Sequence, residues 1–149
     1  MTPRQFVLHT LLTEINIASH LIITRFERAQ PGGLTEPQFG VLNHFARLKK
    51  DAESPSRLAR AFQVTKGAMT NTLQRLEARG FVTLEPDPAD GRGKIVRPTE
   101  AGLAAREAAL AEIAPAFERL FAGVSTDDLE QALPLVRRLR MAMDDAPDR

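Results

Sequence analysis

Cysteine is absent from this chain of 149 residues. Its absence excludes disulfide frameworks, cysteine-ligated zinc and thiol-based redox sensing, and it suits a reducing compartment. The sequence also lacks an apolar run that approaches membrane-spanning length, and its first residues lack the basic and then apolar layout of a signal peptide. We therefore expect a cytoplasmic protein.

The composition is that of an ordinary globular protein, with 43% hydrophobic and 26% charged residues. A chain of this length can bury a sizeable core without metal or disulfide staples, so one domain and no cofactor are expected. The net charge of +1 hides an uneven distribution. Residues 54–97 carry eight basic and four acidic residues, a net charge of +4, which leaves −3 for the rest. A basic middle suits a polyanion-binding module, although random fluctuation of surface charge gives the same pattern.

Periodicity and capping residues predict two helices in the first third of the chain. Apolar residues recur at helical spacing over residues 5–30, and the Pro31-Gly32-Gly33 cluster ends this helix. Thr35 and Gln38 form a capping box that begins a second helix, which extends to about residue 48. Its expected buried face consists of Val41, Leu42, Phe45 and Leu48.

Two further helices follow with a very short connection. Ser54 is a suitable N-cap for a helix that extends to about Phe62, and Thr65 caps the next, which extends to Arg79 and is ended by Gly80. Two helices joined by so tight a turn indicate a helix-turn-helix.

The pattern then changes to a β-hairpin and returns to helix. Residues 81–85 and 94–97 are predicted as strands that flank a turn-rich loop, and we call this hairpin the wing. Thr99 caps a fifth helix to about residue 121, and Ser125 caps a sixth. The predicted fold is mostly α with a small β-hairpin wing.

The fourth helix has two contrasting faces. Apolar residues fall on one side at about 100° per residue, and small polar residues fall on the other. Hydroxyl and amide groups can reach base edges and phosphates in a major groove, and a helix N-terminus favours phosphate. An ordinary solvated helix side has the same appearance, so the context must decide between them. The outward residues are Gly67, Thr70, Asn71, Gln74 and Ala78, flanked by Lys66 and Arg75.

The wing supplies that context, because its loop is longer than a hairpin requires. An arginine at its tip, Arg92, can enter a minor groove, where narrow A·T segments concentrate negative potential. Asp90 can orient this arginine through a charge-assisted hydrogen bond, and Lys94 adds a further positive charge. A plain exposed turn is the alternative interpretation.

The order and spacing of these segments resemble the MarR family of bacterial winged helix-turn-helix regulators, over essentially the whole chain. The resemblance depends on Ser56-Arg57-Leu58-Ala59, Thr65-Lys66-Gly67-Ala68-Met69-Thr70, Leu76-Glu77-Ala78-Arg79-Gly80-Phe81-Val82, Asp90-Gly91-Arg92 and Pro98-Thr99-Glu100-Ala101-Gly102. Two departures are Gly91, where the family often has arginine, and Pro98, where leucine is usual. Proline cannot donate to a strand ladder, so the second strand of the wing should end at Pro98.

The resemblance implies a division of labour along the chain. Residues 34–98 would form the DNA-binding region, with residues 65–75 as the recognition helix and Arg92 in the minor groove, whereas residues 1–33 and 99–149 would form a dimerisation region. A homodimer also suits a pseudo-palindromic operator, which needs two recognition helices roughly 34 Å apart. The predicted DNA-binding residues are Thr65, Lys66, Gly67, Thr70, Asn71, Gln74, Arg75, Asp90, Arg92 and Lys94.

The resemblance further implies a repressor that a small aromatic or anionic effector relieves. Its pocket would lie near the first and second helices, where His20 and His44 are candidate polar anchors. A structural or surface histidine is the alternative for each. The operator sequence, the effector, the regulated genes and the sign of regulation are not readable from the sequence.

Two other functions are compatible with the sequence. An enzyme would have to use its three histidines, but His9 and His20 lie about 16 Å apart along one helix, too far to share a metal. No phosphate loop, serine nucleophile motif or carboxylate pair stands out, so catalysis is not expected. A winged helix can also serve as a protein-interaction module without specific DNA readout, which the basic wing argues against.

Overall fold

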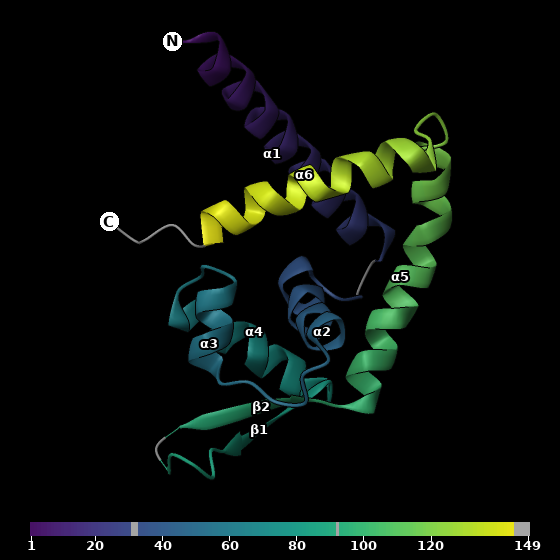
Figure 1. Cartoon of the computed structure of the whole chain (residues 1–149). Helices are drawn as coiled ribbons and strands as arrows, with labels where there is room; N and C mark the ends of the chain where they lie inside the picture. The colour runs from purple at the N-terminus through teal and green to yellow at the C-terminus, as the bar shows by residue number, and fades with distance from the viewer. Residues whose placement is uncertain (31–32, 92, 145–149) are drawn as a thin grey trace. The chain divides into compact units, whose positions relative to one another are not determined.

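The computed structural model describes residues 1–30, 33–91 and 93–144, and the chain divides into two compact units, Met1–Ile113 and Ala114–Arg149. The elements, in chain order, are α1 (Pro3–Ala29), α2 (Glu36–Leu48), α3 (Pro55–Ala61), α4 (Lys66–Ala78), β1 (Val82–Pro86), β2 (Lys94–Pro98), α5 (Glu100–Leu120) and α6 (Thr126–Asp144) (Figure 1). The predicted fold class is confirmed, with each helix boundary within two residues of its expected place.

Capping residues place the helices of the first unit. The Thr35 N–H donates to Gln38 Oε1 at 3.2 Å, and the Ser54 hydroxyl accepts from the Arg57 N–H at 3.3 Å. Thr65 caps α4 by accepting from the Ala68 N–H at 3.1 Å. Each cap satisfies a backbone donor that has no partner inside its own helix, so the helix starts follow from local sequence.

A core between α2, α3, α4 and the wing strands holds this region together, and we call residues 36–98 the winged helix. Its largest fully buried side chains are Phe45, Leu42, Leu58, Leu73, Leu76, Val41, Val82 and Val96. The prediction that Leu48 belongs to the core is wrong, because this residue is 41% exposed in the last turn of α2. The chain turns away immediately after it through the left-handed Lys49, at φ 52°, so the end of the helix extends past the core.

The wing is a two-stranded antiparallel hairpin. Val82 pairs with Pro98 at its root and Pro86 with Lys94 near its tip, and β2 ends at Pro98 as predicted. The loop before α3 adds an isolated bridge, in which Glu53 and Val96 exchange both backbone hydrogen bonds, at 3.1 and 2.9 Å. The wing is therefore tied to the α2–α3 loop at the middle of β2.

The start of α5 fits tightly against the winged helix. The Thr99 hydroxyl caps it by accepting from the Gly102 N–H at 3.0 Å. A Cβ at Gly102 would lie only 2.1 Å from the Phe81 carbonyl oxygen, so glycine is needed for this close approach. Further along, Arg106 donates to Asn43 Oδ1 at 3.1 and 2.8 Å, which joins α5 to α2.

Helix α1 buries little of its apolar surface. Phe26 near its end is buried and packs on Phe39 with ring centroids 4.8 Å apart, whereas Val7, Leu21 and Ile22 are exposed. Helix α1 also has the length and composition of a membrane span, with a window of mean hydropathy 1.5. The expectation that no apolar segment reaches spanning length is therefore wrong for α1, whose interruptions are mostly uncharged polar residues; a soluble core helix passes the same test.

The second unit contains the end of α5 and α6. Ser125 caps α6 as predicted, with its hydroxyl accepting from the Asp128 N–H at 3.1 Å. The apolar side chains of α6 are largely exposed, including Leu129, Leu133, Val136 and Met143.

Candidate nucleic-acid interface

The two faces of α4 differ as the sequence predicts. Met69, Leu73 and Leu76 are buried and anchor the helix in the core. The opposite face is exposed over its whole length, at Thr65, Lys66, Gly67, Thr70, Asn71, Gln74 and Arg75. Because the apolar contacts fix the helix, its polar face presents a set of side chains in a defined order.

The first turn of α4 leaves room for a close approach. A Cβ at Gly67 would meet nothing within 4 Å, so the missing side chain opens space at the surface. The first N–H groups of a helix have no intrahelical acceptor, and they favour anions such as phosphate. The Thr70 hydroxyl donates to the Lys66 carbonyl oxygen at 2.8 Å, which leaves its lone pairs and methyl group for an external contact.

The connection between α3 and α4 has the compact form of a helix-turn-helix. Gln63 adopts a left-handed conformation at φ 51°, and the Val64 N–H donates to the Ala59 carbonyl oxygen at 3.0 Å. This turn leads directly into Thr65, the N-cap of α4, so the core contacts of α3 also set the direction of α4.

The wing loop is organised by backbone hydrogen bonds. The Asp87 N–H donates to the Gly93 carbonyl oxygen at 3.0 Å, and the Gly93 N–H donates to the Asp90 carbonyl oxygen at 2.8 Å. Asp90 is exposed in this loop, and Lys94 is exposed where β2 begins. Arg92 lies outside the described residues, so its minor-groove role and its pairing with Asp90 stay predictions.

The two candidate ligand-binding histidines have different surroundings. His20 is exposed on α1. His44 lies on α2 with its ring 5.6 Å from that of Phe62, and its buried Nε2 has no hydrogen-bond partner among the described residues. Burial lowers the pKa of His44, the charges of Lys50 and Arg47 lower it further, and Glu53 acts in the opposite direction. His44 is therefore neutral at pH 7, and its role as a ligand anchor stays a prediction.

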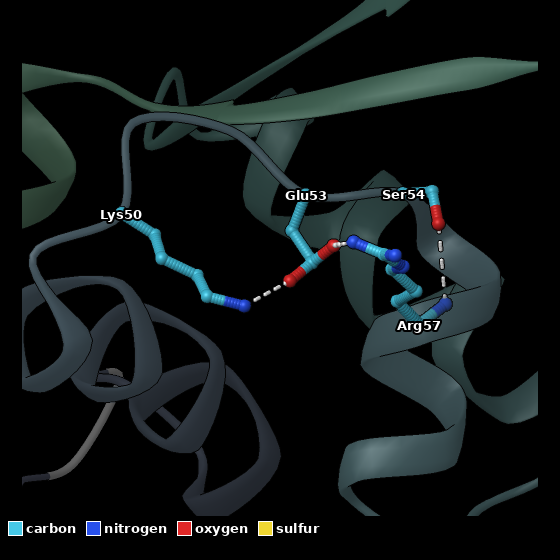
Figure 2. Close-up of polar contacts among 4 residues, drawn as sticks. All are labelled: Lys50, Glu53, Ser54 and Arg57. Carbon is cyan, nitrogen blue, oxygen red and sulfur yellow. Dashed lines mark hydrogen bonds and ion pairs between the residues drawn. The ribbon is translucent and has the colours of Figure 1, made fainter.

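Sequence reasoning missed a polar cluster in the α2–α3 loop, which pairs with the middle of β2 (Figure 2). The buried carboxylate of Glu53 forms ion pairs with Lys50 and with Arg57, whose Nη1 lies 3.6 Å from Glu53 Oε1. Glu53 lies three residues after Lys50 and four residues before Arg57, and such spacings bring side chains together within a helix. Here the residues span a loop, so the spacing alone does not predict their contact. Among the residues that the structure describes, no group of three or more histidine and acidic side chains is placed to hold a metal ion.

Comparison with known proteins relates the winged helix to a protein family. The sequence profile of the MarR family matches residues 32–93, which cover α2 to the tip of the wing. This match covers less than half of the chain, so it relates the winged helix, rather than the whole chain, to the family. The winged-helix fold of residues 36–98 is that of MarR-type transcriptional regulators.

Solved structures of regulators resemble the fold over most of the chain. The transcriptional regulator BldR from Sulfolobus solfataricus matches with a TM-score of 0.80 and 22% identity, over 95% of this chain and 99% of its own. A MarR variant from E. coli in complex with operator DNA matches with a TM-score of 0.66 and 24% identity, over 89% and 97%. The organohalide-sensing regulator RdhR, bound to 2,4-dichlorophenol, matches with a TM-score of 0.73 and 17% identity, over 93% and 82%.

Proposed function

We propose that this chain is a MarR-type transcriptional regulator and that it binds a pseudo-palindromic operator in double-stranded DNA as a homodimer, with α4 of each copy in a major groove. The observation that carries the proposal is the exposed polar face of α4 opposite its buried apolar face. Asn71 and Gln74 are suited to adenine, because an amide side chain can pair with N6 and N7 together. Lys66 and Arg75 would contact phosphates beside them.

The wing would extend the interface into the neighbouring minor groove. Lys94 supplies a positive charge at the start of β2, and Asp90 lies in the loop that would carry Arg92 into the groove. Narrow minor grooves attract arginine through their enhanced negative potential. A MarR variant of the same fold was solved in complex with operator DNA, which supports DNA binding by this fold.

Dimerisation would use residues 1–33 and 99–149. Support comes from apolar side chains of α1 and α6 that the single chain leaves exposed, among them Leu21, Ile22 and Leu133. Soluble monomers rarely expose large contiguous apolar patches, so a second copy of the chain is the expected cover. Burying α1 in a bilayer instead would place His9, Glu14 and His20 in or near the hydrocarbon, which is costly. We therefore propose a cytoplasmic dimer.

Regulation is proposed to be repression that a small aromatic or anionic molecule relieves. RdhR, with the same fold, was solved bound to the chlorinated phenol 2,4-dichlorophenol. His44, with a buried Nε2 beside the Phe62 ring, has an apolar wall and a hydrogen-bonding atom, which suit a phenol. His20 is the second proposed anchor. Thermal shifts with a panel of phenols and benzoates, on the wild type and on His44→Ala, test this part.

Selection of bound duplexes from a random pool tests the proposed function directly. We expect an enriched site with two-fold symmetry and half-sites about one helical turn apart. In titrations on that site, Asn71→Ala or Gln74→Ala should change base preference, whereas Lys94→Ala should reduce the salt slope by about 1 without changing preference. Failure to retain any duplex at low salt would overturn the proposal and favour a protein-interaction module.

A further inference from the structure

Glu53 occupies an unusual place for an acidic residue in a DNA-binding surface. Its side chain is 7% exposed, and its backbone forms both hydrogen bonds of the bridge to Val96, which is itself fully buried in β2. The residue therefore joins the loop before α3 to the middle of the second wing strand.

The carboxylate is ionised and fully engaged. Burial on its own raises the pKa of Glu53, but the hydrogen bond and charge of Lys50, the Ser54 N–H and the charge of Arg57 together hold the pKa below its usual value. One buried negative charge therefore faces two cations, and this cluster of three side chains keeps a net charge of +1 beside the middle of β2.

Arg57 is held at two points although its side chain is 75% exposed. Its main-chain N–H donates to the Ser54 hydroxyl, and its guanidinium lies against the Glu53 carboxylate, as Figure 2 shows. An exposed ion pair contributes about 0–1 kcal/mol to stability, so stability alone is a weak reason for this arrangement. The guanidinium has five N–H donors in a rigid fork, and most of them stay directed to solvent.

The position of Arg57 matches the part of a helix-turn-helix that meets the DNA backbone. When the second helix enters the major groove, the first helix crosses the phosphates, and Arg57 lies in the first turn of that first helix, α3. We propose that Arg57, in the first turn of α3, is a phosphate-contacting residue and that Glu53 is the positioning residue that orients it. This proposal rests on the proposed DNA binding.

Glu53 could repel phosphate or orient Arg57, and these two roles predict opposite effects of Glu53→Gln on DNA binding. If the carboxylate only repels phosphate, Glu53→Gln removes an anion and tightens DNA binding. If the carboxylate orients Arg57, the same change releases the guanidinium and weakens binding by about threefold, because a freely rotating side chain loses rotamer entropy when it meets phosphate. Arg57→Ala should weaken binding about five- to tenfold and reduce the salt slope by about 0.9.

The experiment is a double-mutant cycle with the full chain and the selected duplex, titrated at several salt concentrations. We expect Glu53→Gln to have no weakening effect in the Arg57→Ala background, because its target is gone. Arg60→Ala is the matched control, since it removes the same charge at the other end of α3 and should be additive with Glu53→Gln. Urea unfolding of each variant shows that it is folded at the assay temperature. If Glu53→Gln is unfolded, Arg57→Gln replaces the cycle. An unchanged salt slope in Arg57→Gln would then overturn the proposal.

The outcomes separate the proposal from the function beneath it. If the wild type binds no duplex in a salt-dependent way, the proposed function fails. If the wild type binds, an unchanged salt slope in Arg57→Ala overturns the phosphate contact. Tighter binding by Glu53→Gln, or additivity with Arg57→Ala, overturns the positioning role.

Discussion

The winged helix and the helices α1 and α6 treat their apolar residues in opposite ways. In the winged helix, Leu42, Phe45 and Leu73 are essentially inaccessible to solvent, whereas Leu21 of α1 and Leu133 of α6 are 52% and 47% exposed. The hydrophobic effect is proportional to the apolar area removed from water, so the first region gains its stability within one chain. The exposed apolar residues of α1 and α6 do not contribute this stabilisation within the single chain. The contrast teaches that the winged helix buries its apolar residues through its own contacts, whereas α1 and α6 leave theirs for a cover such as the proposed second copy.

The largest expected effect lies in the core of the winged helix. Phe45→Ala removes a fully buried ring and should lower the free energy of unfolding by about 3–5 kcal/mol, measured by urea unfolding at fixed protein concentration. Leu48→Ala, on the same helix but 41% exposed, is the control and should cost much less. Equal losses would break the comparison, because they would mean that the exposed end of α2 is also covered.

Dimerisation supplies the next effect. Leu133→Asp puts a charge on the apolar surface of α6 and should weaken self-association by roughly 30-fold or more, since burying one leucine is worth about 1.5–3 kcal/mol. Sedimentation velocity over a range of concentrations measures it, and Gln131→Asp on the same helix is the control. If Leu133→Asp associates like the wild type, α6 is not part of the interface. Circular dichroism should show the winged helix intact in both.

The junction between the winged helix and α5 should respond more moderately. Gly102→Ala forces a methyl group against the backbone of Phe81 and should cost about 1–3 kcal/mol of stability. Gly67→Ala is the matched control, because its added Cβ meets nothing and alanine favours helix by roughly 1 kcal/mol. We expect Gly67→Ala to raise the thermal midpoint and yet weaken DNA binding, which requires close backbone approach. A stabilised Gly102→Ala would show that α5 does not pack here as described.

The smallest expected effect is a dependence of stability on pH. The pKa of His44 is lowered in the folded state, so the unfolded chain binds the proton more readily. Stability is therefore present above the unfolded pKa of about 6.5 and decreases as pH falls toward the folded pKa. His44→Phe keeps a ring against Phe62 and should flatten the change in urea midpoint between pH 7 and 5.

Local features of the fold were readable from the sequence, because caps and helix ends involve neighbouring residues. Thr35, Ser54 and Thr65 begin their helices where expected, and Pro98 ends β2 because it lacks an N–H. The outward face of α4 was also predictable, since helical periodicity alone separates Asn71 from Leu73. Whether these outward residues contact DNA is a prediction that exposure permits and binding must test.

Features that depend on distant pairing were not readable. The burial of Glu53 follows from its bridge to Val96, 43 positions further along the chain, and nothing in the local sequence shows that pairing. The exposure of Leu48 has the same origin, because its periodicity is correct but the core ends before it. Tertiary contacts therefore determine the burial of Glu53 and the exposure of Leu48. The ion pair of Glu53 and Arg57 depends on the same contacts, so the predicted interface did not include it.

The bridge between Glu53 and Val96 limits how the hairpin can move. Val96 also pairs with Leu84 in the middle of the ladder, so β2 is paired at this residue with β1 on one side and with the α2–α3 loop on the other. This bridge restrains motion of the hairpin about its base more than motion of the stretch beyond it. Under the proposed function, that outer stretch would adjust to an operator with a wider or narrower minor groove, and an effector that displaces the hairpin would also move the loop that leads into α3.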